Sequence, residues 1–98
     1  MSERHDDEYV SHPLYPIFMS ALEQLMYGKG RRHGGHVEPF LEQPWRHYAK
    51  VHGPGFLTGQ AAKKLDESVA GKTDEAYVQE LLGAINYIAM EILRYRLP

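Results

Sequence analysis

The sequence contains no cysteine, no long apolar run and no large net charge, and each absence excludes a class of protein. Without cysteine, the chain cannot be a disulfide scaffold, a cysteine-bearing zinc finger or a thiol enzyme. No stretch approaches about 18 consecutive apolar residues, so no membrane span is expected. The formal net charge is −2, whereas nucleic-acid-binding proteins usually carry a strongly basic face. Nucleic acid is therefore not expected to be the partner.

What the chain does contain is an ordinary globular composition, with 43% hydrophobic and 24% charged residues. Residues 1–12 differ from the rest, because they are acidic and almost free of apolar side chains. They predict a disordered acidic tail, and they lack the apolar segment of a secretory signal, which favours a cytoplasmic location. Residues 13–98 have the length of one small domain.

Apolar residues recur at three- and four-residue steps in two long segments, which predicts helices over about 15–27 and from 74 to near the C-terminus. Pro16 is typical of a first helical turn, and Thr73 is a suitable N-cap for the last helix. A shorter helix is predicted over about 59–70, with Thr58 as its N-cap and Gly71 at its end. Because the link between the last two helices is short, they should form an antiparallel hairpin.

The last helix is expected to bury one apolar stripe, formed by Val78, Leu81, Leu82, Ile85, Ile88, Ala89, Ile92 and Leu93. Its opposite side holds Glu80, Gly83 and Arg94, but Tyr87 and Met90 interrupt that polar face. A helix with two partly apolar faces in so small a chain predicts a homodimer.

The segment between the first and third helices is rich in glycine and proline, which predicts a long loop over about 28–57. Two helical turns are expected within it at 44–51, with Trp45, Tyr48 and Val51 facing inward. No strand-like alternation occurs anywhere. The sequence therefore predicts an all-α fold: a small helical bundle with a Gly/Pro-rich loop before a C-terminal helical hairpin.

A basic, glycine-rich segment follows the first helix. Lys29, Arg31 and Arg32 place three positive charges within four residues, and the neighbouring glycines let backbone N–H groups approach an anion. His33 can add a further phosphate contact. These residues predict phosphate binding, although a basic turn that stabilises the end of the first helix is the alternative.

Acidic residues on three predicted helices form the second constellation: Glu23, Asp66, Glu67 and Glu80. Carboxylates that converge in a helical bundle can hold Mg²⁺. The alternative is a solvated polar face, because Met26 and Gly83 stand where a paired second acid would lie.

Aromatic residues in the predicted loop, above all Trp45 and Tyr48, could stack on a nucleobase. Anchoring of the loop to the core is the alternative role. Four histidines, His33, His36, His47 and His52, also lie nearby, but their spacing does not favour a metal site.

Several segments in this order resemble a known family. They are Leu25-Met-Tyr-Gly-Lys-Gly-Arg-Arg-His-Gly34, the Trp-containing loop, Lys63-Lys64, Gly71-Lys-Thr-Asp-Glu75 and Gln79-Glu-Leu-Leu-Gly-Ala-Ile-Asn-Tyr-Ile88. Over about residues 13–96 the chain resembles the small phage and bacterial dATP/dGTP diphosphohydrolase-like proteins. These are relatives of the MazG-type all-α NTP pyrophosphatases.

The resemblance implies hydrolysis of a nucleoside triphosphate to its monophosphate and pyrophosphate, with Mg²⁺ as cofactor. It implies that Glu23 and Glu80 are the catalytic metal ligands and that Asp66 or Glu67 assists them. Lys63 and Lys64 would join the basic segment in holding the triphosphate. The alternative function is a non-catalytic helical interaction protein of phage or mobile-element type, which would bind a partner protein.

Overall fold

A computed structural model of the chain describes residues 3–28, 39–70 and 73–98, and all regular structure within them is helical. This confirms the predicted all-α class. The elements are α1 (Glu3–Val10), α2 (Tyr15–Tyr27), the short 3₁₀ helix η1 (Phe40–Glu42), α4 (Pro44–His52), α5 (Gly55–Val69) and α6 (Asp74–Arg96). In these described ranges, no helix has the length and apolar character needed to cross a membrane.

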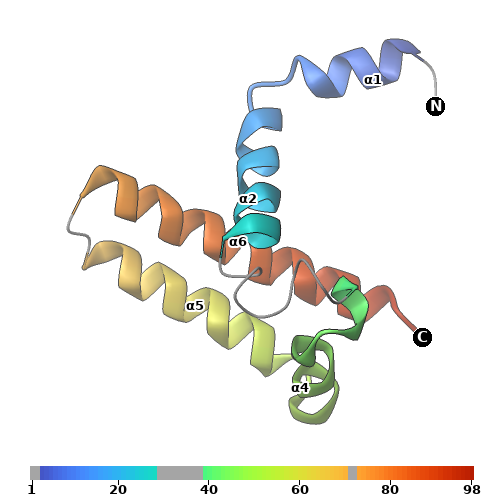
Figure 1. Cartoon of the computed structure of the whole chain (residues 1–98), viewed down its shortest axis with the longest axis vertical. Helices are drawn as coiled ribbons and strands as arrows, with labels where there is room; N and C mark the ends of the chain where they lie inside the picture. Colours follow the sequence, from blue (N-terminus) through green and yellow to red (C-terminus); the bar gives the residue numbers. More distant parts are fainter. Residues whose placement is uncertain (1–2, 29–38, 71–72) are drawn as a thin grey trace.

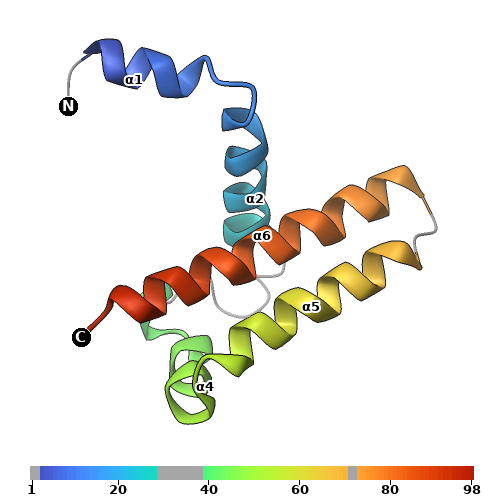
Figure 2. The ribbon, with the colours of Figure 1, turned by 180° about the vertical axis from the view of Figure 1, so that it is seen from behind.

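Helices α5 and α6 form the predicted antiparallel hairpin, and they lie side by side in both views of the ribbon (Figures 1 and 2). The Thr73 hydroxyl oxygen accepts a hydrogen bond of 3.0 Å from the Ala76 N–H, so Thr73 is the N-cap that the sequence predicts. The hairpin buries small and medium side chains, which let the two helices approach closely; they are Leu57, Ala61, Ser68, Leu82 and Ala84.

Helix α5 begins at Gly55 and not near Gly59, so the predicted start of this helix is wrong by about one turn. Thr58 is therefore not the N-cap of α5 but a residue within the helix. The Thr58 hydroxyl donates a hydrogen bond of 2.9 Å to the Pro54 carbonyl. The chain reverses earlier because Gly53, at the end of α4, has a φ of 74°, a conformation that glycine adopts without steric cost.

Helix α4 exists as predicted, but its inner face differs from the prediction. Ala49 is fully buried and packs with Leu57 and Met90, whereas Tyr48 and Val51 are exposed. Trp45 is half-buried, and its indole N–H donates to the Phe40 carbonyl at 2.9 Å. The small Ala49 side chain lets α4 approach α5 closely, which turns the larger residues outward.

Helix α2 has the predicted bounds and stands across α6 (Figures 1 and 2). Of its residues only Ala21 is buried. Other apolar residues that should have faced a core are 44–55% exposed: Ile17, Phe18, Leu22 and Met26. The segment before α2 also differs from expectation, because Glu3–Val10 of the predicted disordered tail form the helix α1, which projects away from the hairpin. The side chains of Asp6, Asp7 and Glu8 lie in solvent, so the helix buries no charge at these positions.

The buried face of α6 matches the predicted stripe only in part: Leu82 is buried as expected. Val78, Ile88 and Ile92 are about half exposed, while Gly83 and Met90, assigned to the far side, are buried. The reason is that α2 and α5 both pack on α6 through small and polar residues. Gly83 is one of these, and Asn86 is another. The predicted stripe is apolar, but much of it has no described element against it.

Candidate functional site

A cavity of about 840 Å³ lies among α2, α4, α5 and α6, with a volume typical of small-molecule sites. Its lining has two ends of different chemistry. Four aromatic rings form one end, and a lysine–glutamate group with several amides forms the other. Residues from all parts of the described chain after α1 contribute, so the helical packing creates this site.

The aromatic end is built from η1, α4 and the first turn of α5. The rings of Phe40 and Trp45 have centroids 5.0 Å apart, and those of Tyr48 and Phe56 are 6.0 Å apart. All four side chains line the cavity. Trp45 and Tyr48, the residues predicted to stack on a base, therefore lie together at one cavity, where a planar apolar ligand could contact them.

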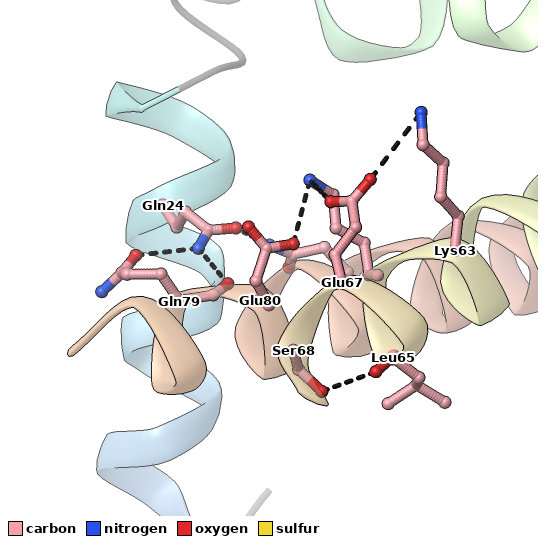
Figure 3. Close-up of polar contacts among 9 residues, drawn as sticks. Gln24, Lys63, Leu65, Glu67, Ser68, Gln79 and Glu80 are labelled. Carbon is pink, nitrogen blue, oxygen red and sulfur yellow. Dashed lines mark hydrogen bonds and ion pairs between the residues drawn. The ribbon is translucent and has the colours of Figure 1, made fainter. Parts of the chain in front are cut away.

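The opposite end is an ion-pair network between α5 and α6. The Lys64 ammonium lies 3.4 Å from the Glu80 carboxylate and 3.6 Å from the Glu67 carboxylate. Figure 3 shows Glu67 of α5 and Glu80 of α6 facing one another, with Lys63 on the far side of Glu67 at 3.8 Å. The Lys64 side chain lines the cavity and is only 11% exposed.

The carboxylates of this network are not equivalent. The pKa of Glu67 is lowered, and the largest cause is a hydrogen bond with Glu80. Partial burial, the second effect in size, acts in the opposite direction, whereas the charges of Lys64 and Lys63 lower the pKa further. The Glu80 Oε2 atom is buried and makes no hydrogen bond with any described residue, and it is ion-paired with Lys64. A buried carboxylate oxygen without a hydrogen bond can accept one from a ligand or contact a cation.

Gly83 of α6 lies where a side chain would crowd Lys64 and Gln24. A Cβ atom there would lie 3.3 Å from Cδ of Lys64 and 3.6 Å from the side-chain oxygen of Gln24. The bare backbone of Gly83 therefore gives the Lys64 side chain room to cross α6 and reach Glu80.

Amide side chains join α2 to α6 beside this network, and sequence reasoning missed them. The Gln24 amide donates to the Gln79 carbonyl at 2.8 Å and to the Gln79 side chain at 2.9 Å (Figure 3). The buried Asn86 amide donates to the Ala21 carbonyl at 2.8 Å. One signal in the sequence was available: Asn86 interrupts an otherwise apolar part of α6.

The structure brings together only some of the predicted site residues. Of the four predicted metal ligands, Glu67 and Glu80 meet, whereas Glu23 and Asp66 are exposed and make no polar contact with described residues. Within the described ranges no three acidic or histidine side chains converge as a metal site would require. Lys64 lines the cavity, and Lys63 is 67% exposed.

The predicted phosphate ligands Lys29, Arg31, Arg32 and His33 lie outside the described residues, as does His36. Gly28, which immediately precedes that segment in the sequence, lines the cavity. His47 and His52 lie near aromatic rings, with centroids 5.7 Å from Tyr48 and 6.3 Å from Phe56.

No family model, no curated protein and no solved structure matches this chain. A function therefore has to be inferred from the chemistry of the cavity and from the pattern of residues in the sequence.

Proposed function

We propose that the chain binds a nucleoside triphosphate in this cavity and hydrolyses it to the monophosphate and pyrophosphate, as the enzymes that it resembles do. The observation that supports the proposal is the pairing of four aromatic rings with the poorly exposed Lys64 ammonium in one cavity. Lys64 follows Phe56 by eight residues on α5, which corresponds to about 12 Å along a helix. A nucleotide matches this arrangement, because it has an aromatic base at one end and anionic phosphates at the other.

In this proposal Trp45 and Tyr48 stack on the base, and the Lys64 ammonium attracts the phosphates. Lys63 and the basic residues at 29, 31 and 32 supply further positive charge, and His33 supplies a further phosphate contact. The proposed reaction belongs in the cytoplasm, where nucleoside triphosphates are abundant.

Glu67 and Glu80 are the residues that would hold Mg²⁺. The buried Oε2 of Glu80 suits a cation, and two carboxylates are sufficient because Mg²⁺ often uses one or two of them together with substrate phosphates. Magnesium would neutralise charge on the phosphates. The Lys64 ammonium, which lies 3.4 Å from Glu80 and 3.6 Å from Glu67, would move toward the phosphates when a cation took its place beside the carboxylates. Glu23 and Asp66 make no contact with this pair, so the proposal does not depend on them.

The test is incubation of the full chain with the eight canonical ribo- and deoxyribonucleoside triphosphates and Mg²⁺, with pyrophosphate release as the readout. We expect release from at least one nucleotide and its loss in the Glu80→Gln variant. Glu75→Gln is the matched control, because Glu75 is an exposed acid of α6 outside the cavity. Absence of pyrophosphate release at high protein concentration would refute the enzymatic proposal.

Protein interaction is the second candidate function, and the exposed face of α2 favours it. Phe18 and Leu22 of α2, with Ile85, Ala89 and Leu93 of α6, line a second, smaller groove of about 250 Å³. We propose that a second copy of the chain covers this groove. A symmetric dimer would bury apolar residues of both helices that are half exposed in the single chain.

Light scattering at micromolar concentration tests this proposal, with a dimer as the expected result. Phe18→Glu should produce a monomer, because a charge at a buried interface is costly. Val69→Glu is the control, since Val69 is 83% exposed on α5 and does not line the groove. A monomeric wild-type chain would contradict the homodimer and would favour a different partner protein.

A further inference from the structure

Among the described residues that line the cavity, one amide side chain makes no hydrogen bond with another residue. Five amides line the cavity: Gln24, Gln43, Gln60, Gln79 and Asn86. Gln24, Gln79 and Asn86 are joined to one another or to the backbone, and Gln43 also has a polar interaction. Gln60 alone makes no side-chain hydrogen bond with another residue in the described ranges. Its donor and acceptor are therefore available to a ligand.

Gln60 lies on α5 between the aromatic end and the charged end of the cavity. Phe56, Gln60 and Lys64 are spaced four residues apart, so they follow one another on the same face of the helix, about 6 Å per step along the axis. All three line the cavity. An aromatic ring, an amide and an ammonium group thus succeed one another between the two ends of the site.

The same order occurs in a nucleotide, whose sugar lies between its base and its phosphates. We infer that Gln60 recognises the sugar hydroxyls of the bound nucleotide and makes the site selective for them; this inference rests on the proposed nucleotide binding. The amide can donate to one hydroxyl oxygen and accept from another hydroxyl. A site that hydrogen-bonds a hydroxyl disfavours analogues without it, because the amide is then left unpaired.

The test compares the affinity for a ribonucleoside triphosphate with that for its 2′,3′-dideoxy counterpart. Calorimetric titration of the full chain in EDTA, which prevents metal-dependent turnover, should show about five- to tenfold tighter binding of the ribonucleotide. The Gln60→Met variant, which has a similar size but no hydrogen-bonding group, should lose most of this preference and bind the dideoxynucleotide as wild type does. The 2′-deoxy nucleotide then shows which hydroxyl is contacted, and either assignment supports the inference.

Two further variants separate recognition of the sugar from general damage to the site. Gln79→Met removes an amide of the same cavity that is already joined to Gln24, so it should leave the preference for the ribonucleotide unchanged. Gln60→Glu keeps the acceptor and should retain part of the preference. An unchanged preference in Gln60→Met, or none in the wild-type chain, would overturn the inference while nucleotide binding stood. If the wild-type chain bound no nucleotide, both the inference and the proposed function would fall.

Discussion

Helix α2 is more apolar than either helix of the α5–α6 hairpin, yet it buries less of its apolar surface. The hairpin buries Leu57 completely, in a cluster with Ala49 of α4 and Met90 of α6, and it buries Leu82 almost completely. Helix α2 buries one alanine and leaves Phe18 and Leu22 about half exposed. Its contact with α6 includes hydrogen bonds from the amide side chains of Gln24 and Asn86.

This difference shows that an apolar stripe predicts a helix without predicting what covers it. Tight packing in the hairpin holds Lys64, Glu67 and Glu80 close together, so the charged end of the cavity is formed by two closely packed helices. Helix α2 forms another wall of the cavity, and it contacts α6 less extensively than α5 does. Its exposed face is available for the second copy of the chain proposed above.

A matched pair of leucine substitutions tests this comparison with the largest expected effect. Leu57→Ala removes a side chain with no exposure, and we expect it to lower the free energy of unfolding by about 2–5 kcal/mol. Leu22→Ala makes the same chemical change at a residue that is 45% exposed, and should cost less than about 1 kcal/mol in the monomer. Urea denaturation at low protein concentration measures both values.

The outcome for Leu22 also depends on the dimer. A cost that grows with protein concentration would show that Leu22 is buried between two copies of the chain. Equal costs for the two leucines in dilute solution would contradict the comparison, because α2 would then pack as tightly as the hairpin does.

Substitution of Asn86 tests the amide contacts of α2. Asn86→Ala removes the hydrogen bond to the Ala21 carbonyl and should lower the free energy of unfolding by about 1–3 kcal/mol, because that buried oxygen loses its side-chain partner. Hydrogen exchange should show a larger loss of protection in α2 than in α5. Equal loss of protection in both helices would mean that α2 and the hairpin unfold as one unit.

Much of the helical layout could be predicted from the sequence, because it depends on local signals. Pro16 and Gly28 bound α2, and the Thr73 cap starts α6. The buried faces could not be predicted in the same way. Burial depends on which helix lies opposite, and Ala49 and Gly83 are buried because their small size permits close contact, which a search for large apolar residues overlooks.

The candidate site was predictable only as an inventory of residue types. Trp45, Tyr48, Lys64 and Glu80 could be chosen for their chemistry, and all four line one cavity. The isolation of Glu23 follows from the angle at which α2 crosses α6, which no local pattern encodes. Gln60 carried no signal at all, since a polar residue on an amphipathic helix is ordinarily solvated.

The ion pairs of the hairpin give the smallest expected effect, through their dependence on pH. The pKa of Glu67 is lowered in the folded chain, so its ionised carboxylate stabilises the fold above the ordinary glutamate pKa of about 4.3. That contribution is lost as the pH falls through the lowered value. The difference in melting temperature between wild type and Glu67→Gln should therefore be constant near neutral pH and shrink below about pH 4. Because Glu67 is 40% exposed, added salt should reduce the difference at neutral pH as well. A difference that depended on neither pH nor salt would show that the charge of Glu67, which pairs with Lys63 and Lys64 of its own helix, does not stabilise the fold.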